Sequence, residues 1–193
     1  MWRKKSDFKP DRIGSGFLNK LYLTQRQRMK LLKWALYSVV LLVLSLLQDV
    51  ILCRISIFGT NTDLFVSGML LLCMMVPVDT SAVFALISAV FYYFSGAAPG
   101  TYSIFFLTGL GVLLNIFRYS YLRKGFGSAM LCAVTALMLY ELLVYITGVF
   151  LGYTTAARFG AFCVTGLISA AAMPILYPIY VSIGKIGGES WKE

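Results

Sequence analysis

Residues 34–53 of this chain read WALYSVVLLVLSLLQDVILC, a stretch with a single charged residue, Asp49. At a rise of about 1.5 Å per residue, a helix of this length is about 30 Å long, which matches the hydrocarbon core of a bilayer. Trp34 stands at one end of the stretch, where the membrane interface favours aromatic side chains. The stretch therefore predicts a helix that crosses a membrane.

Similar apolar stretches follow along the rest of the chain. Of its 193 residues, 59% are hydrophobic and 13% are charged, which is about half the charged share of a typical soluble domain. The further predicted spans are residues 62–78, 80–95, 101–117, 128–150 and 159–183. The sequence thus predicts an all-α integral membrane protein with six transmembrane helices, a single domain over residues 34–183.

The third and fourth predicted spans are shorter than a standard crossing of roughly 20 residues. They fit either two crossings or one re-entrant hairpin over 80–117. We favour two crossings, because irregular backbone cannot face lipid. The third span carries Ala85 and Ala89 four residues apart, a spacing of small residues that predicts close contact with a neighbouring helix.

Positive charge is concentrated at the amino end of the chain. Residues 1–33 hold ten of the 17 Lys and Arg residues. With six crossings and the amino end inside, the cytoplasmic segments hold 15 of them, and Arg54 and Arg158 remain outside. By the positive-inside rule, both ends of the chain are cytoplasmic, the carboxyl end as a short tail over 184–193.

The basic arm over 1–33 has two parts. Residues 1–16 read as a polar tail, whereas Leu18, Leu21, Met29 and Leu32 recur at helical spacing with basic residues between them. Residues 17–33 therefore fit an amphipathic helix on anionic lipid of the inner interface, and a solvated basic linker is the alternative. A basic arm beside a membrane span indicates lipid rather than nucleic acid.

The composition argues against catalysis and metal binding. The chain has no histidine, which removes the commonest general base and metal ligand. Its four cysteines lie in or beside apolar stretches without a C-x-x-C pair, and we interpret them as packing residues. No catalytic motif is present. We therefore expect no enzymatic activity, no cofactor and no metal.

A few polar residues lie within or beside the predicted spans. Glu141, in the middle of the fifth span, is costly in lipid and faces either a binding site or another helix that it locks in place; Tyr145 is a candidate hydrogen-bond partner. Gln48 and Asp49 lie near the outer end of the first span, and Asp49 fits an ion pair with Arg158 or with Arg54. Thr60 and Asp63 have the spacing of a helix capping box.

The order of these features resembles the rod shape-determining protein MreD family of bacteria. The matching pieces cover about 40–180; they are Leu47-Gln48, Asp63-Leu64, the turn Ser95-Gly96-Ala97-Ala98-Pro99-Gly100, the basic stretch from Arg118 to Lys124, Tyr140-Glu141-Leu142 and Leu176-Tyr177-Pro178. The chain departs from the family pattern at Tyr92-Tyr93-Phe94, where the family often has an aspartate, and at Thr62, where a proline is common.

The resemblance implies a scaffold of the cell-wall elongation complex in the bacterial inner membrane. Such a subunit binds MreC, a single-span protein with a periplasmic domain, and connects MreB filaments with the peptidoglycan synthases. The residues expected at partner contacts are Gln48, Asp49, Asp63, Pro99, Gly100, Tyr140, Glu141 and Arg158. The basic arm faces the side of MreB and of anionic lipid.

A substrate-binding S component of an energy-coupling-factor vitamin transporter is the alternative. S components are similar in size, six-helix layout and orientation, and the family fold resembles theirs. They carry a small A-x-x-x-A stripe on the first span, whereas Ala35 is followed here by Val39. The sequence therefore favours the scaffold.

Overall fold

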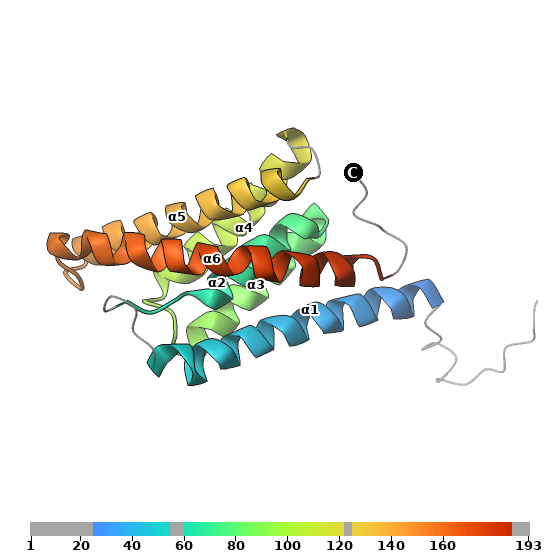
Figure 1. Ribbon diagram of the computed structural model, residues 1–193, viewed down its shortest axis with the longest axis horizontal. Helices are drawn as coiled ribbons and strands as arrows, with labels where there is room; N and C mark the ends of the chain where they lie inside the picture. Colours follow the sequence, from blue (N-terminus) through green and yellow to red (C-terminus); the bar gives the residue numbers. More distant parts are fainter. Residues whose placement is uncertain (1–24, 55–59, 122–124, 187–193) are drawn as a thin grey trace, which may run out of the picture.

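The computed structural model describes residues 25–54, 60–121 and 125–186, which form six α-helices and two short 3-10 turns. In chain order these elements are α1 (Gln25–Val50), η2 (Leu52–Arg54), α2 (Leu64–Met75), α3 (Val78–Phe94), α4 (Tyr102–Tyr121), α5 (Phe126–Phe150), η3 (Ala156–Arg158) and α6 (Phe159–Gly184). The helices run side by side as an elongated bundle, and α1 begins at the same end of the bundle at which α6 finishes (Figure 1). The all-helical class predicted from the sequence is confirmed for the described residues.

Among the described residues, three helical segments are long and apolar enough to cross a membrane: Arg28–Val50, Phe126–Phe150 and Ala156–Gly184. The other three helices contain shorter apolar stretches, Leu64–Met75, Thr80–Phe94 and Tyr102–Arg118. Large apolar side chains such as Val39, Ile87 and Ile175 are more than half exposed on the outside of the bundle. An apolar outer surface of this kind is compatible with a helical membrane protein.

The first helix differs from the expectation at its start. Residues 25–33 continue directly into α1, so this part of the basic arm is not a separate interfacial helix. The rest of the predicted amphipathic segment, 17–24, lies outside the described residues, as do the polar tails 1–16 and 187–193.

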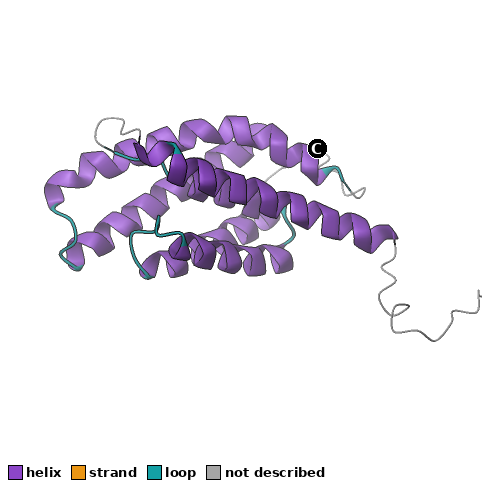
Figure 2. Cartoon of the chain, turned by 90° about the horizontal axis from the view of Figure 1, so that it is seen from below, coloured by secondary structure: helices purple, strands orange, loops and turns teal. Residues whose placement is uncertain are grey.

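The centre of the bundle is α2, the shortest of the six helices. Every residue from Phe65 to Met74 is buried, and α2 contacts each of the other five helices. A helix that is apolar all round lies either in a protein core or in a membrane, and α2 lies among the other helices. Figure 2 shows that helices joined by loops make up the described chain. At about 1.5 Å per residue its 12 residues measure about 18 Å, less than the hydrocarbon thickness.

The predicted span 62–78 was too long at both ends. Pro77 disfavours helical backbone at the preceding residue, and Val76 is extended, with ψ of 151°. The chain then turns directly into α3, whose first turn closes with the Ser81 amide donating to the Pro77 carbonyl oxygen at 2.8 Å.

Side chains of neighbouring helices satisfy the carboxyl end of α2. The amide of Asn115, on α4, donates to the carbonyl oxygens of Cys73 and Val76, the latter at 2.7 Å. The hydroxyl of Ser81 also donates to the Cys73 carbonyl oxygen, at 3.2 Å. The last carbonyls of a helix have no partner within it, and here they are too deeply buried to meet water. The sequence analysis did not single out Asn115, although a lone amide in an apolar stretch is a signal of this role.

Replacement of Asn115 is expected to destabilise the fold. Asn115→Ala leaves the buried Val76 carbonyl oxygen without its donor and the Cys73 carbonyl oxygen with Ser81 alone, so we expect the free energy of unfolding to fall by about 2 kcal/mol. Thermal unfolding followed by circular dichroism in mild detergent measures the change. Thr135→Ala, on the exposed side of α5, removes a hydroxyl that bonds only within its own helix and should change stability by less than about 0.5 kcal/mol. Equal melting of the two variants would contradict the capping role.

Small residues allow α3 and α4 to pack closely, as predicted. Ala85 and Ala89 are fully buried. A Cβ added to Gly111 of α4 would lie 3.2 Å from the Cβ of Ala85 and 3.2 Å from the sulfur of Cys73. Cys73, Cys132 and Cys163 are free thiols among the described residues.

Candidate functional site at one end of the bundle

Asp63 immediately precedes α2 and is the meeting point of four other helices. Its Oδ1 accepts hydrogen bonds from the Tyr92 hydroxyl of α3 at 3.3 Å and from the Gln48 amide of α1 at 3.4 Å. Its backbone amide donates to the Ser169 hydroxyl of α6 at 2.7 Å. Its carboxyl group also interacts with that of Glu141, on α5.

The predicted capping box is therefore wrong. Asp63 occupies the N-cap position of α2, but its side chain makes no capping hydrogen bond, because its carboxyl group is engaged by side chains from α1, α3 and α5. In a capping box, Thr60 would be the N-cap residue and the acid would follow three positions later, inside the helix. Here α2 begins at Leu64, so Asp63 itself is the N-cap residue and Thr60 lies three residues before it.

Gln48 supplies the missing cap from another helix. Its Oε1 accepts the backbone N–H of Phe65, in the first turn of α2, at 2.8 Å. Gln48 is buried, and the N–H groups in the first turn of a helix have no intrahelical acceptor. The hydroxyl of Ser67 joins the same end of α2 to the Ser169 carbonyl oxygen of α6 at 3.0 Å. Gln48 of α1 thus fixes where α2 begins.

Glu141 is 4% exposed although it is a carboxylic acid in the middle of an apolar helix. Among the described residues, no group donates a hydrogen bond to its buried Oε1, and the neighbouring group is the carboxyl of Asp63. The predicted partner Tyr145 is engaged elsewhere, since its hydroxyl donates to the Ala156 carbonyl oxygen at 3.2 Å. Two adjacent buried carboxyl groups must share a proton or receive a cation.

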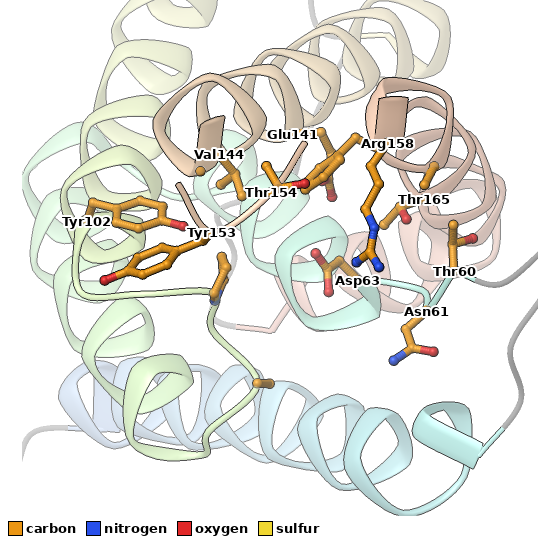
Figure 3. A pocket seen from close by; sticks show the side chains of 15 residues that line it. Thr60, Asn61, Asp63, Tyr102, Glu141, Val144, Tyr153, Thr154, Arg158 and Thr165 are labelled. Atoms are coloured by element: carbon orange, nitrogen blue, oxygen red, sulfur yellow. The ribbon is translucent and has the colours of Figure 1, made fainter. Parts of the chain in front are cut away.

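A cavity of about 410 Å³ lies above these two carboxyl groups. Figure 3 shows Asp63, Glu141 and Arg158 around it, with the guanidinium group of Arg158 on the same side as the Asp63 carboxyl. The rest of the lining comes from Thr60, Asn61, Ala97, Pro99, Tyr102, Val144, Gly148, Tyr153, Thr154, Ala161, Phe162 and Thr165. A second hollow of about 400 Å³ borders Asp63 as well and is lined by Gln48 and Asp49 among others.

Two glycine turns place the loops around the cavity. Gly152 follows α5 with a φ of 74°, and the amide of Tyr153 donates to the Gly148 carbonyl oxygen at 2.9 Å. This is a Schellman ending, which favours glycine at the left-handed position. It brings the loop that carries Tyr153 and Thr154 back over the cavity. Gly96, just after α3, also has a positive φ, of 78°, and its amide donates to the Tyr93 carbonyl oxygen at 3.2 Å.

An alanine at the left-handed position tests this loop. We expect Gly152→Ala to lower the free energy of unfolding by about 1 kcal/mol, because an L side chain is strained at this φ. Gly109→Ala is the matched control, since Gly109 lies inside α4 with nothing within 4 Å of an added Cβ, and alanine is the better helix former. Its melting temperature should stay equal or rise; if Gly152→Ala rose as well, the strain argument would fail.

The structure brings together most of the residues that the sequence singled out. Glu141, Asp63, Pro99 and Arg158 line the first cavity, and Gln48 and Asp49 line the adjoining one. Asp49 accepts a hydrogen bond from the Ser45 hydroxyl at 3.4 Å. Arg158, one of its two predicted ion-pair partners, lines the first cavity with Asp63 and Glu141, whereas Asp49 lines the second.

Two of the singled-out residues lie beside the cavities instead of lining them. Tyr140 is buried next to Glu141, and Gly100 lies in the turn before α4. Sequence reasoning missed Tyr92 and Ser169, because tyrosine and serine are common in apolar helices and carry no local signal.

The arrangement is suited to binding a small polar group. It combines two buried carboxyl groups, a guanidinium group and several hydroxyl groups in a partly apolar cavity, which is the usual character of a ligand site. No group of three or more His, Cys, Asp or Glu side chains is placed to hold a metal ion within the described ranges.

Compared with known proteins, the chain matches no family model, and neither a curated protein nor a solved structure matches it significantly. Its fold and site define a helical bundle with three helices long and apolar enough to cross a membrane and a polar cavity at one end of the bundle.

Proposed function

We propose that this chain is a six-span scaffold of the cell-wall elongation complex in the bacterial inner membrane, similar to MreD. The resemblance rests on short pieces distributed over the sequence. In the structure, four of these pieces contribute to one place: Gln48, Asp63, the turn with Ala97 and Pro99, and Glu141 all border the two adjoining cavities. Their convergence is the observation that carries the proposal, because unrelated chance matches have no reason to meet.

The proposed orientation places both ends of the chain in the cytoplasm. The amino end of α1 and the carboxyl end of α6 lie at one end of the bundle, and α6 begins at the other end (Figure 1). The first cavity is lined by the loops that lead into α2, α4 and α6, so it lies at that other end. Arg28, Lys30 and Lys33 in the first turns of α1 and Arg118 near the end of α4 carry the positive charge that favours the inner face. The cavity end then faces the periplasm, on the side of an MreC-like partner.

The short α2 fits six crossings. A 12-residue helix is too short to cross while facing lipid, but α2 is enclosed by the other helices, and side chains satisfy its ends. Broken or short helices are accepted at membrane depth where protein surrounds them. The function would then consist of partner contacts, without chemistry of its own.

Depletion in the native host tests the scaffold function. We expect cells that lose the protein to widen and round up, because wall elongation loses its membrane subunit, and a copy supplied in trans should restore their shape. Cell width measured by phase-contrast microscopy is the readout. Unchanged width and growth after complete depletion would contradict the proposal.

An S component of a vitamin transporter is the second candidate, and the cavity of about 410 Å³ at the outer end favours it. A cavity of this size falls in the range of small-molecule sites, roughly 300–1,000 Å³. Depletion would then leave cell width normal and abolish growth on low concentrations of one vitamin. The two candidates thus predict opposite results in the same depletion strain.

A further inference from the structure

The cavity beside Asp63 has an unmet need for a hydrogen-bond donor. The Oε1 atom of Glu141 is buried without a donor in the described part of the chain, and the side chain is 4% exposed. The carboxyl group of Asp63 shares a hydrogen bond with that of Glu141 and accepts two more from Tyr92 and Gln48, but none of these reaches the Oε1 atom of Glu141. A cationic donor that entered the cavity would meet both carboxyl groups at once.

At the mouth of the cavity, in contrast, the charged group is a cation, which suits an anionic group of a ligand. Arg158 is exposed and precedes the first turn of α6, a helix of 26 residues. Its guanidinium group projects into the space near Asp63 (Figure 3). A planar guanidinium binds phosphate or carboxylate through two parallel hydrogen bonds, and the positive end of the α6 dipole also favours an anion there.

We propose that this cavity binds a zwitterionic group, whose ammonium is held by Asp63 and Glu141 and whose phosphate or carboxylate is held by Arg158. An ammonium supplies three donors, which is what the carboxyl pair lacks. Arg158 and the proton-sharing pair carry opposite charges, so a zwitterion enters without leaving a net charge in the site. A simple amine has to compete with Arg158 for the carboxyl groups, and a simple anion gains nothing from them.

Two sources supply this chemistry: the headgroup of phosphatidylethanolamine, or a free small molecule such as phosphoethanolamine. The cavity lies at the end of the bundle, among the loops before α2, before α4 and before α6, which is the depth of lipid headgroups if the bundle spans a bilayer. The inference does not require the scaffold role, because it depends only on the groups around the cavity.

The test uses the full-length protein in nanodiscs of phosphatidylglycerol, a lipid without an amine. Calorimetric titration with phosphoethanolamine at about pH 5, where its phosphate carries about one negative charge, should show saturable binding. Ethanolamine and glycerol phosphate should each bind at least about tenfold more weakly, since each lacks one of the two charge-assisted contacts. In a second arm, native mass spectrometry of protein from discs with equal parts of phosphatidylethanolamine and phosphatidylglycerol identifies the retained lipid.

Two variants locate the site. Glu141→Gln should weaken phosphoethanolamine by about tenfold or more, and Arg158→Gln should do the same while leaving ethanolamine binding equal or stronger. Arg54→Gln replaces an exposed arginine at the end of η2 that does not line the cavity; it is the matched control and should change the binding of neither ligand. Because Arg158 is exposed, its variant should fold even if the buried Glu141 variant does not.

Retention of phosphatidylethanolamine and not of phosphatidylglycerol identifies the lipid headgroup as the ligand. Saturable phosphoethanolamine binding without such retention identifies a free zwitterion as the ligand. The proposal is overturned if neither phosphatidylethanolamine nor phosphoethanolamine binds, or if the Arg158→Gln and Arg54→Gln proteins bind phosphoethanolamine equally well. Cell shape after depletion is measured separately from ligand binding to the purified protein. A failure of the scaffold role is therefore distinguishable from a failure of this site.

Discussion

Asp63→Ala is expected to lower the free energy of unfolding by about 3 kcal/mol. The buried Tyr92 hydroxyl and the buried Gln48 amide both lose their acceptor, and an unsatisfied buried donor costs about 1–3 kcal/mol. Glu141 also loses its neighbour and is left as an isolated buried acid. Thermal unfolding in mild detergent, followed by circular dichroism, gives the change relative to the unmodified protein.

Asp63→Asn is the matched variant. It keeps an oxygen that accepts from Tyr92 and Gln48, so we expect a loss of less than about 1 kcal/mol. The difference between the two variants measures what the acceptor contributes, separately from the charge. If Asp63→Ala melted like Asp63→Asn, the joint between the helices would not depend on Asp63.

The second large effect is expected for Gln48→Leu, which should cost about 2–3 kcal/mol. Leucine is similar in size, but it leaves the Phe65 N–H without an acceptor at the buried start of α2 and removes the donor to Asp63. A buried backbone N–H without a partner is rare because it costs about as much as a lost hydrogen bond. The same unfolding experiment measures this loss.

Leu46→Ala provides the comparison for Gln48→Leu. Leu46 is 54% exposed on the outside of α1, two residues away, and its truncation should cost less than about 1 kcal/mol. A Gln48→Leu protein as stable as Leu46→Ala would show that α2 is held by packing alone and that its cap is dispensable.

The apolar runs of the sequence located the helices well. The predicted spans 128–150 and 159–183 correspond to α5 (Phe126–Phe150) and α6 (Phe159–Gly184), because a long apolar run that crosses a membrane has to be a helix. The run 62–78 was less informative. Its residues are apolar on all sides, which fits a span that faces lipid as well as a helix enclosed by protein. The pattern therefore does not show that α2 is enclosed by five other helices or that it stops before Val76.

The sequence identified several residues of the candidate site one by one, but it did not show that they lie together. Glu141 and Asp63 attract notice because acids are costly among apolar residues, and Gln48 because it lies at the end of a span. Their meeting depends on how α1, α2 and α5 pack, which side-chain periodicity does not encode. The partners of Asp63 on α3 and α6, Tyr92 and Ser169, are ordinary residues of apolar helices and become significant only through contact.

The scaffold role is tested most directly by what purifies with the protein. A tag at the carboxyl end, solubilisation of native membranes in mild detergent and mass spectrometry of the bound proteins identify its neighbours. We predict a single-span protein with a periplasmic coiled-coil domain, together with peptidoglycan synthases. Recovery of a pair of ATPases with a transmembrane coupling subunit would contradict the scaffold and would make the chain the binding subunit of a transporter.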